Sequence, residues 1–319
     1  MMDAFSGDIL KNWGIDFKRI CDDLPISGSP ERCLRRFVVE DVKGSLFVFE
    51  QISPDQIPRR EEIGAALATL SERGLRNLHA YLPTISKGYV LTSGSDVCQL
   101  SPYTKDAGLN RFEYMDDAWR GVSLADFLVN LKNAASPGLP LKDGRSFSIF
   151  GFIHDLQQKL KEFHPDVFNE TADIADFLDN DFRSVHDRAP VMFCHGDFHP
   201  LNVIWAENGI TAVIDWEFMG LKPEFYDIAT MIGCVGVEDP RGLTGGLIRH
   251  FLATLDRVSF LSAPIRRRLP EAVIALRFAW LAIWMRNSDL EMIDMETRYL
   301  RILYDHLDDL KYSWGCENF

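Results

Sequence analysis

Residues 194–217 read CHGDFHPLNVIWAENGITAVIDWE, from Cys194 to Glu217. Two short apolar runs, 203–206 and 210–214, flank the pair Asn208-Gly209. Both residues of this pair tolerate a positive φ, and an Asn-Gly pair between apolar runs is the strongest short-range signal for a β-hairpin. The stretch therefore predicts two antiparallel strands joined by a two-residue turn.

The register of this hairpin predicts a metal site. A two-residue turn at Asn208-Gly209 places Asn202 opposite Asp215 at the far end of the ladder, and opposed residues have Cβ atoms about 4.5–5.5 Å apart. Amide and carboxylate oxygens are ligands that Mg²⁺ takes at about 2.0–2.1 Å while it keeps several waters. Asp197, on the loop before the hairpin, would add a third acid, which suits a base that accepts a proton from an attacking hydroxyl.

These residues resemble a known family. His195-Gly196-Asp197, followed by Asn202 and then Asp215, is similar to the catalytic and metal-binding loops of the aminoglycoside phosphotransferase and choline kinase superfamily, relatives of protein kinases. The resemblance implies that Asp197 is the catalytic base. It also implies that Asn202 and Asp215 hold Mg²⁺ on the phosphates of ATP.

The resemblance continues downstream and implies a fold. The segment from Pro223 to Ala229 is similar to the family's stretch in which an Asp, here Asp227, anchors the catalytic loop from behind, and His195 is expected to brace that loop. The implied fold is α+β and two-lobed, like that of protein kinases. A small antiparallel sheet forms the N-terminal lobe, residues 1–103, and a larger, mainly helical C-terminal lobe spans residues 104–319.

Simpler structural explanations remain for the same residues. Asp197 could cap its own loop through its side chain. Asn202 and Asp215 could share a plain cross-strand hydrogen bond. Glu217 could lie near a metal or be a solvated charge.

The N-terminal third predicts the nucleotide-covering parts of the small lobe. Residues 33–40 and 45–52 form a predicted hairpin, preceded by a Ser/Gly loop that contains Gly28 and Ser29. In the kinase-like plan such a loop covers the phosphates with backbone N–H groups, although an ordinary turn explains it equally well. A hairpin is predicted from 81–85 and 88–92. The strand at 97–100 then leads to a hinge where the backbone of Gln99, Ser101 and Tyr103 is expected to meet adenine.

One position departs from the family. The second strand should carry a lysine that grips the α- and β-phosphates, but Glu50 lies in that region. A carboxylate there would repel triphosphate, so either Glu50 points elsewhere or another cation substitutes. The candidates are Arg35, Arg36, Arg59 and Arg60. The departure leaves open a catalytically silent, pseudokinase-like module that binds nucleotide without turnover.

The rest of the chain is predicted to be mainly helical. Residues 58–73 form a helix with an apolar stripe at Ile63, Leu67 and Leu70, and Gly74 ends it. Glu61 or Glu62 in its first turn could replace the family's helix glutamate, although acids are favoured there by the helix dipole.

Two further helices are predicted at 265–286 and 289–311. In the first, Arg277, Trp280 and Trp284 share one face and could contact the acceptor, although helical aromatic residues are usually core.

Composition restricts the partners. The 34 Lys and Arg against 47 Asp and Glu give a formal charge of −13, without a marked basic run, which disfavours nucleic acids and anionic membranes. The six cysteines show no Cys-x-x-Cys spacing and are typical of reduced thiols in a cytoplasmic protein. No secretory signal and no transmembrane span are expected.

The leading hypothesis is a kinase that uses ATP and Mg²⁺ to phosphorylate a hydroxyl of a small molecule. The acceptor could be a sugar, an amino sugar, an aminoglycoside, a choline-like amino alcohol or homoserine. Besides the silent module, a metallohydrolase could use His195, Asp197, His199 and Asp215. The spacing of its two histidines is helix-like, but Gly196 and Pro200 argue against a helix there.

Overall fold

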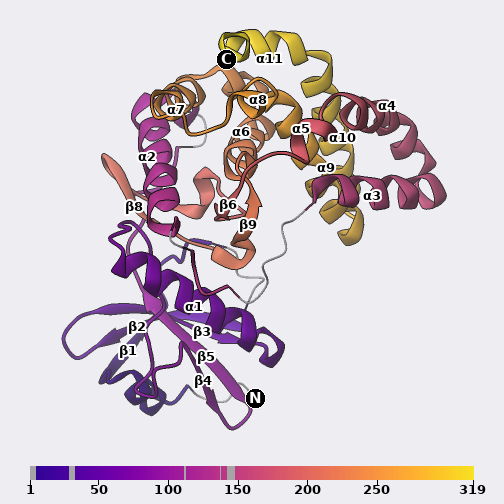
Figure 1. Cartoon of the computed structure of the whole chain (residues 1–319). Helices are drawn as coiled ribbons and strands as arrows, with labels where there is room; N and C mark the ends of the chain where they lie inside the picture. The colour runs from indigo at the N-terminus through magenta and orange to yellow at the C-terminus, as the bar shows by residue number, and fades with distance from the viewer. Residues whose placement is uncertain (1–4, 29–32, 111–112, 137, 142–147) are drawn as a thin grey trace. The chain divides into compact units, whose positions relative to one another are not determined.

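The computed structural model describes residues 5–28, 33–110, 113–136, 138–141 and 148–319 (Figure 1). The chain forms two compact units. The sheet unit comprises Met1–Leu109, Asn133–Asp143 and Leu201–Met219, and the helical unit comprises Asn110–Lys132, Gly144–Pro200 and Gly220–Phe319. An antiparallel sheet with a mainly helical remainder confirms the predicted α+β fold class. A division at residue 103 stays a prediction; by contacts, the segment 201–219 belongs with the sheet.

The sheet unit is built on five strands in the order β1-β2-β3-β5-β4, and all neighbours are antiparallel. The strands are β1 (Phe17–Cys21), β2 (Arg35–Asp41), β3 (Leu46–Ile52), β4 (Val90–Ser93) and β5 (Asp96–Pro102). The β2–β3 hairpin confirms the predicted one. The predicted strand at 81–85 is wrong: its Pro83 has no N–H to give to a ladder, and β4 pairs with β5 instead.

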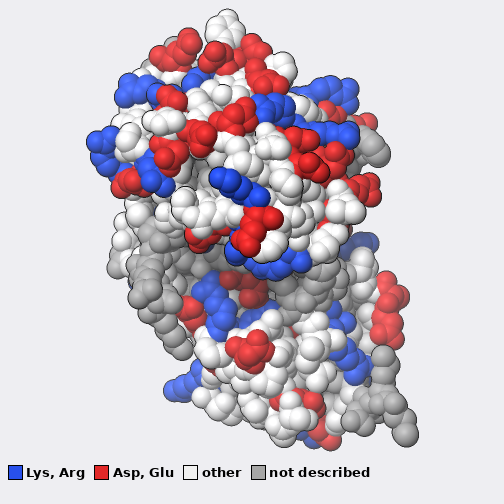
Figure 2. Space-filling view, turned by 90° about the vertical axis from the view of Figure 1, so that its right-hand side faces the viewer, with Lys and Arg blue, Asp and Glu red and all other residues white. Residues whose placement is uncertain are grey.

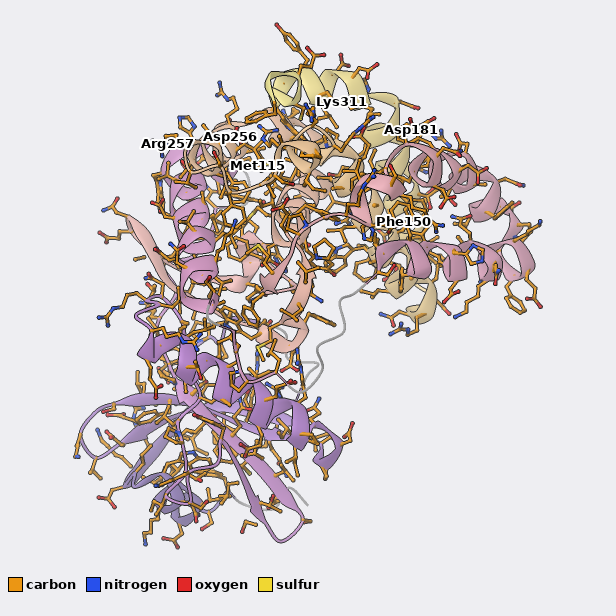
Figure 3. All side chains as sticks on the ribbon, in the orientation of Figure 1. Met115, Phe150, Asp181, Asp256, Arg257 and Lys311 are labelled. Carbon is orange, nitrogen blue, oxygen red and sulfur yellow. The ribbon has the colours of Figure 1, made fainter. Side chains whose placement is uncertain are left out.

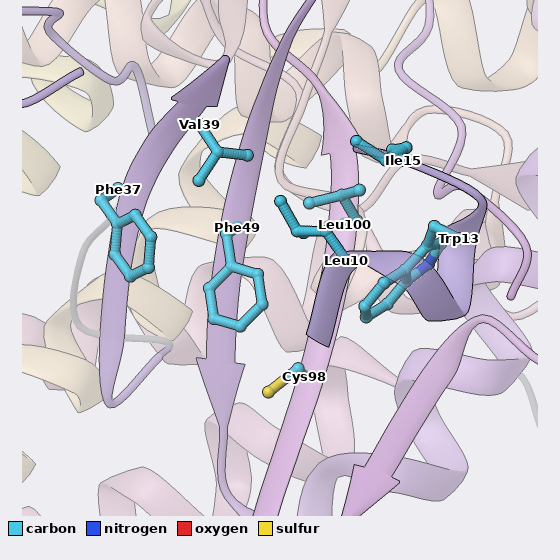
Figure 4. Packing of buried hydrophobic residues seen from close by; sticks show 8 residues of the cluster. All are labelled: Leu10, Trp13, Ile15, Phe37, Val39, Phe49, Cys98 and Leu100. Atoms are coloured by element: carbon cyan, nitrogen blue, oxygen red, sulfur yellow. The ribbon is translucent and has the colours of Figure 1, made fainter. Parts of the chain in front are cut away.

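One face of this sheet carries an apolar cluster (Figure 4). Phe37, Phe49 and Leu100 project from three neighbouring strands, and the short 3-10 helix η1 (Gly7–Trp13) adds Leu10 and Trp13. Side chains alternate between the two faces of a strand. Residues 36, 48, 50, 99 and 101 therefore point to the opposite face, which carries the polar groups.

Helix α1 (Ile57–Glu72) lies against that polar face of the sheet. Its predicted stripe is confirmed, since Ile63, Leu67 and Leu70 are fully buried. Its fourth residue, Arg60, is buried as well and reaches Glu50 on β3.

The acids at the start of α1 have structural partners. Both carboxylate oxygens of Glu61 accept the backbone N–H of Tyr89, and one accepts that of Val90. Glu62 pairs with Arg59 at 2.7 Å. These partners favour a structural explanation for Glu61 and Glu62 over the role of the family's helix glutamate, because the residue of α1 that meets Glu50 is Arg60.

The helical unit contains most of α2 and nine further helices of the described chain. They are α2 (Ala118–Ala135), α3 (Ile149–Phe163), α4 (Pro165–Asp181), α5 (Arg183–His186), α6 (Tyr226–Glu238), α7 (Gly246–Arg257), α8 (Ala263–Arg266), α9 (Leu269–Asn287), α10 (Leu290–Asp305) and α11 (Leu307–Ser313). The predicted closing helix breaks at His306, between α10 and α11. Two buried charges here are paired: Arg266 binds Asp256 at 2.7 Å, and Glu271 binds Lys311 at 2.8 Å. Figure 3 labels Asp256 and Lys311 among the side chains of this unit.

The charged side chains on the surface and the character of the helices can be compared with the expectations from composition. Figure 2 shows acidic and basic side chains interspersed on the face it draws, without one continuous basic patch among the coloured residues. Among the residues that the structure describes, no helix has the length and apolar character needed to cross a bilayer.

Candidate active site

The hairpin of β7 (Val203–Ala206) and β8 (Gly209–Val213) exists, but its predicted register is wrong. Ala206 pairs with Gly209 and Val203 pairs with Val213, with an irregularity after Ile204. The turn therefore lies one residue earlier than the Asn-Gly pair. Consistent with this shift, the backbone N–H of Ile214 donates to the carbonyl of Asn202 at 3.0 Å.

The irregularity in the ladder coincides with contacts outside the hairpin. The backbone N–H of Trp205 donates to the carboxylate of Asp106 at 2.9 Å, and its carbonyl accepts the N–H of Ala107 at 2.9 Å. Both bonds hold Trp205 to a segment outside the hairpin, next to the point where the ladder is irregular. Asn202 thus lies opposite Ile214, not Asp215, and Asp215 follows directly.

Asp215 leaves the strand in a left-handed conformation, with φ of 65°. It lies against Gly28: a Cβ on this glycine would be 3.1 Å from Oδ2 and 3.2 Å from Oδ1 of Asp215. Gly28 itself has a φ of +89°, which an L side chain rarely adopts. A side chain at this position would be strained, and its Cβ would require the loop or the carboxylate to move by a few tenths of an ångström. The structure therefore brings together two predicted site residues that are 187 positions apart in the printed sequence.

A pocket of the sheet unit is lined by Asp215 and by Ile26 and Ser27, the two residues before Gly28. Its apolar walls include Val48 on β3, Ile204 on β7 and Ile214. Apolar walls with a few convergent polar groups are typical of small-molecule sites.

Two of the three predicted hinge residues, Ser101 and Tyr103, also line this pocket. Gln99 does not: it is fully buried between β3 and β4, and its side-chain amide donates to Glu50 at 3.2 Å. Strand β4 pairs with β5 only as far as Gln99. Of the residues of β5 that follow, Ser101 and Pro102 line the pocket. Ser29, the other predicted loop residue, lies outside the described residues.

A buried ionic cluster surrounds Glu50, the strand residue found where a lysine was expected. Arg60 Nη1 lies 2.6 Å from Glu217 and 3.9 Å from Glu50, and it donates to the Tyr81 hydroxyl at 3.1 Å. Burial raises the pKa of Glu50, while the Arg60 charge lowers it. The charges of a strand lysine and a helix glutamate are therefore reversed here, with the acid on the strand and the base on the helix. Glu217, left open by the sequence, is a partner of Arg60.

The His195–Asp197 loop belongs to the helical unit and follows β6 (Val191–Cys194), which pairs with β9 (Gly220–Pro223). Asp227, in the first turn of α6, accepts the backbone N–H of His195 at 2.7 Å and that of Gly196 at 2.8 Å. Burial raises the pKa of Asp227 to about 6, and these two N–H groups oppose the rise. The carboxyl thus fixes the backbone directly before Asp197.

Histidines hold Asp197 from two sides. The fully buried His195 accepts the backbone N–H of Asp197 through Nδ1 at 3.2 Å. His199 Nε2 lies 3.6 Å from the Asp197 carboxylate. Of the described residues, no group of three or more His, Cys, Asp or Glu is placed to share a metal ion. A zinc hydrolase needs three or four such ligands. The described residues therefore do not support the metallohydrolase alternative.

The predicted acceptor residues lie on α9. Arg277 is buried and binds Glu296 on α10 through its Nε at 2.6 Å. Trp280 and Trp284 are half-buried and stack with ring centroids 6.0 Å apart. The guanidinium of Arg277 is satisfied inside the unit, which favours the structural explanation for this residue. An acceptor contact at the two tryptophans stays a prediction.

Sequence reasoning missed His79 and Tyr81, which also line the pocket. His79 bonds the Thr104 hydroxyl at 3.1 Å, and burial lowers the pKa of its imidazole. The apolar pattern of 81–85 suggested a strand, and for that reason these side chains were not considered as part of a pocket. Pro83 was the available signal that the segment is irregular.

The residues present fit a bound Mg²⁺. Asn202 and Asp215 supply an amide and a carboxylate from one hairpin, and Gly28 leaves open the space beside the carboxylate that a Cβ would fill. Mg²⁺ is held by one or two protein ligands together with phosphate oxygens and water, so two side chains suffice.

Solved structures share this fold. An aminoglycoside phosphotransferase from Alicyclobacillus acidocaldarius superposes with a TM-score of 0.69 at 14% identity, over 100% of this chain and 98% of the other. An amicoumacin kinase, solved in complex with AMP-PNP, Ca²⁺ and Ami, gives 0.65 at 13% identity, over 94% of each chain. A choline/ethanolamine kinase family protein from Mesorhizobium loti gives 0.57 at 15% identity, over 90% and 92%.

Comparison with curated proteins finds no match to this sequence. A sequence model described as "Phosphotransferase enzyme family" matches residues 35–261. This match covers more than two thirds of the 319 residues and includes both the pocket-lining strands and the His195–Asp197 loop. The chain therefore belongs to the phosphotransferase enzyme family.

Proposed function

We propose that the chain is an ATP- and Mg²⁺-dependent kinase that transfers the γ-phosphoryl group to a hydroxyl of a small molecule. The observation that carries the proposal is the approach of the Gly28 loop to the Asp215 carboxylate inside a lined pocket. A loop beside an acid that can hold Mg²⁺ is what phosphoryl transfer requires, because the protein contributes mainly positioning and electrostatic stabilisation.

In this proposal the adenine ring binds between Val48 on one side and Ile204 and Ile214 on the other. The backbone of Ser101 to Tyr103 meets the polar edge of the ring. These six residues line the same pocket as Asp215. The base and the phosphates thus bind along one side of the sheet.

Asn202 and Asp215 would hold the metal. When bound, Mg²⁺ neutralises charge on the phosphate oxygens. Asp215 is fixed for this role by its position at the end of β8 and by the glycine beside it.

Asp197 is the proposed base: it orients the acceptor hydroxyl and takes its proton. The bonds from the N–H groups of His195 and Gly196 to Asp227 hold the loop, so that the Asp197 carboxylate is presented without a large entropy cost. Asp227 and His195 are positioning residues in this scheme.

The catalytically silent alternative rested on Glu50. Because Glu50 lies 3.9 Å from Arg60 in a buried cluster, it has a structural partner, and its charge is not simply directed at a triphosphate. The acid on the strand therefore no longer argues against turnover.

The acceptor is proposed to be a polyhydroxylated or amino-bearing small molecule. The names of the matched structures include kinases of aminoglycosides, spectinomycin, macrolides and amicoumacin, and a choline/ethanolamine kinase family protein. The formal charge of −13 is compatible with a cationic acceptor.

The test is a phosphorylation screen with ATP or GTP over pooled amino sugars, antibiotics and amino alcohols. Wild type is compared with Asp197→Asn, which keeps the shape of the side chain, and with Asp176→Asn as a surface control. We expect Asp197→Asn to lose at least about 100-fold in kcat, as for loss of a general base, and the control to match wild type. Undiminished turnover in Asp197→Asn, or no phosphorylated product in any pool, contradicts the proposal.

A further inference from the structure

A triphosphate in the proposed pocket needs a cation from the protein, and β3 offers Glu50 in place of a lysine. Four arginines are near in sequence, and the structure separates them. The following inference rests on the proposed function, since it concerns how the same nucleotide is held.

Two of the four arginines are committed elsewhere. Arg35 points to the apolar face of the sheet, where its guanidinium lies 4.7 Å from the centre of the Phe37 ring. Arg59 binds Glu62 at 2.7 Å and donates to the carbonyls of Glu217 and Met219. Neither lines the pocket.

Arg60 lines the pocket, but its charge is already balanced. Its side chain is 5% exposed, and carboxylates of Glu217 and Glu50 lie at 2.6 and 3.9 Å. Two acids around one cation leave a net negative charge at this end of the pocket. Moving Arg60 toward phosphate would strip both acids of their partner, at a large cost for buried charges.

Arg36 has a different environment. It lies on β2 directly opposite Glu50 of β3, is partly exposed, and lines the pocket. Its guanidinium donates to three successive carbonyls, those of Gly28 at 2.7 Å, Ile26 at 3.2 Å and Ser27 at 3.5 Å. Carbonyl oxygens satisfy N–H groups but do not cancel a full positive charge. Burial raises the pKa of Glu50 on the facing strand, and the Arg36 charge lowers it. Among the described residues, however, Arg36 forms no ion pair within 4.0 Å, whereas Arg60 forms two.

The position of Arg36 is what a phosphate ligand needs. It grips the carbonyls of the loop whose Gly28 meets Asp215, so the cation, the loop and the proposed metal ligand are connected in one pocket. A guanidinium also has five N–H donors in a planar fork, which matches phosphate oxygens bidentately.

We propose that Arg36 binds the phosphates of the nucleotide in place of the strand lysine, while it holds the 26–28 loop over Asp215. The Glu50–Arg60–Glu217 cluster serves as the buried support beneath it. The phosphate-binding cation has thus moved from β3 to the neighbouring strand.

The test compares affinities for ATP and adenosine, measured by isothermal titration in Mg²⁺ without acceptor. Arg36→Gln is the variant, Arg36→Lys the conservative one, and Arg35→Gln the matched control on the opposite face of the same strand. We expect Arg36→Gln to weaken ATP binding about 10- to 100-fold, the range for a charged hydrogen bond. Adenosine binding should change less than about twofold, because adenosine has no phosphate. Arg36→Lys should recover part of the loss, and Arg35→Gln should bind as wild type does.

Other outcomes have distinct meanings. An equal loss of affinity for ATP and adenosine in Arg36→Gln would mean that Arg36 only orders the loop. An unchanged ATP affinity would mean that Arg36 has no role in binding. Either result overturns this inference and leaves the proposed function standing. An ATP-specific loss in Arg60→Gln but not in Arg36→Gln would assign the role to Arg60. Wild type that binds neither ligand would overturn the proposed function as well. If Arg36→Gln does not fold, judged by circular dichroism, the decision rests on Arg36→Lys, which must weaken ATP selectively.

Discussion

Arg60 should be the residue that makes two buried acids compatible with the fold of the sheet unit. The perturbation is a double-mutant cycle of Arg60→Gln and Glu50→Gln. Arg60 lies 2.6 Å from Glu217 and 3.9 Å from Glu50, and none of the three side chains is more than 17% exposed. At an effective dielectric constant of 20, unit charges about 4 Å apart attract by about 4 kcal/mol.

The two single substitutions should differ strongly. Arg60→Gln leaves Glu50 and Glu217 near each other without the cation between them, and removing one member of a buried ion pair costs about 3–5 kcal/mol. Glu50→Gln keeps the shorter pair of Arg60 with Glu217, and it removes a carboxyl whose pKa burial has raised. We expect its cost to be under about 1.5 kcal/mol, the net value of a single hydrogen bond. In the double variant, Glu50→Gln should recover about 1–3 kcal/mol of the loss, as contacting residues do.

The assay is urea unfolding followed by tryptophan fluorescence. Trp205 and Trp216 are buried in the sheet unit and report on it. Glu62→Gln, which removes the less buried pair with Arg59, is the control and should cost at most about 1 kcal/mol. The reasoning fails if Arg60→Gln costs no more than Glu50→Gln, or if the two losses add within about 0.5 kcal/mol.

Three further outcomes follow from single contacts. Asp227→Asn should cost about 1–3 kcal/mol in urea unfolding, because an amide cannot accept both N–H groups that the carboxyl accepts. Since burial raises the pKa of Asp227 to about 6, the folded state binds the proton more tightly, so wild-type stability should fall as pH rises from about 4 to about 6. The asparagine variant should lack that slope. Gly28→Ala should weaken ATP–Mg²⁺ binding in titration, since its Cβ would meet the Asp215 carboxylate and its left-handed φ costs about 1–2 kcal/mol. Glu296→Gln should lose about 3–5 kcal/mol in unfolding by stranding the buried Arg277, and a small loss would contradict the structural account of α9.

Sequence patterns within a single segment predicted several helices and strands correctly. The β2–β3 hairpin, the stripe of α1 and its end before Gly74 follow from alternation, from period 3.6 and from a glycine stop. The β7–β8 hairpin was also visible in the sequence. Its register was not, because the turn forms one residue before the Asn-Gly pair and the ladder is irregular next to Trp205, which binds Asp106 and Ala107 outside the hairpin.

The residues that line the pocket also depend on contacts between distant segments. The sequence identifies the candidate arginines but not which of them lines the pocket. Arg35 and Arg36 are adjacent and differ only in the face of β2 that they occupy. Alternation fixes that they point to opposite sides. It does not say which side is covered by the apolar cluster, and that depends on η1, a segment about 25 residues earlier in the chain.

The charge reversal between strand and helix explains why the missing lysine does not require a missing site. A strand acid with a buried guanidinium beside it is neutral as a unit to a first approximation, whereas a lone acid would repel phosphate. The other charged side chains in the pocket lining are Glu217, which also pairs with Arg60, and Arg36 and Asp215. In the proposed function, Arg36 binds phosphate oxygens and Asp215 holds the divalent ion. On that proposal, the cation that a lysine on β3 would have supplied comes instead from Arg36 on β2.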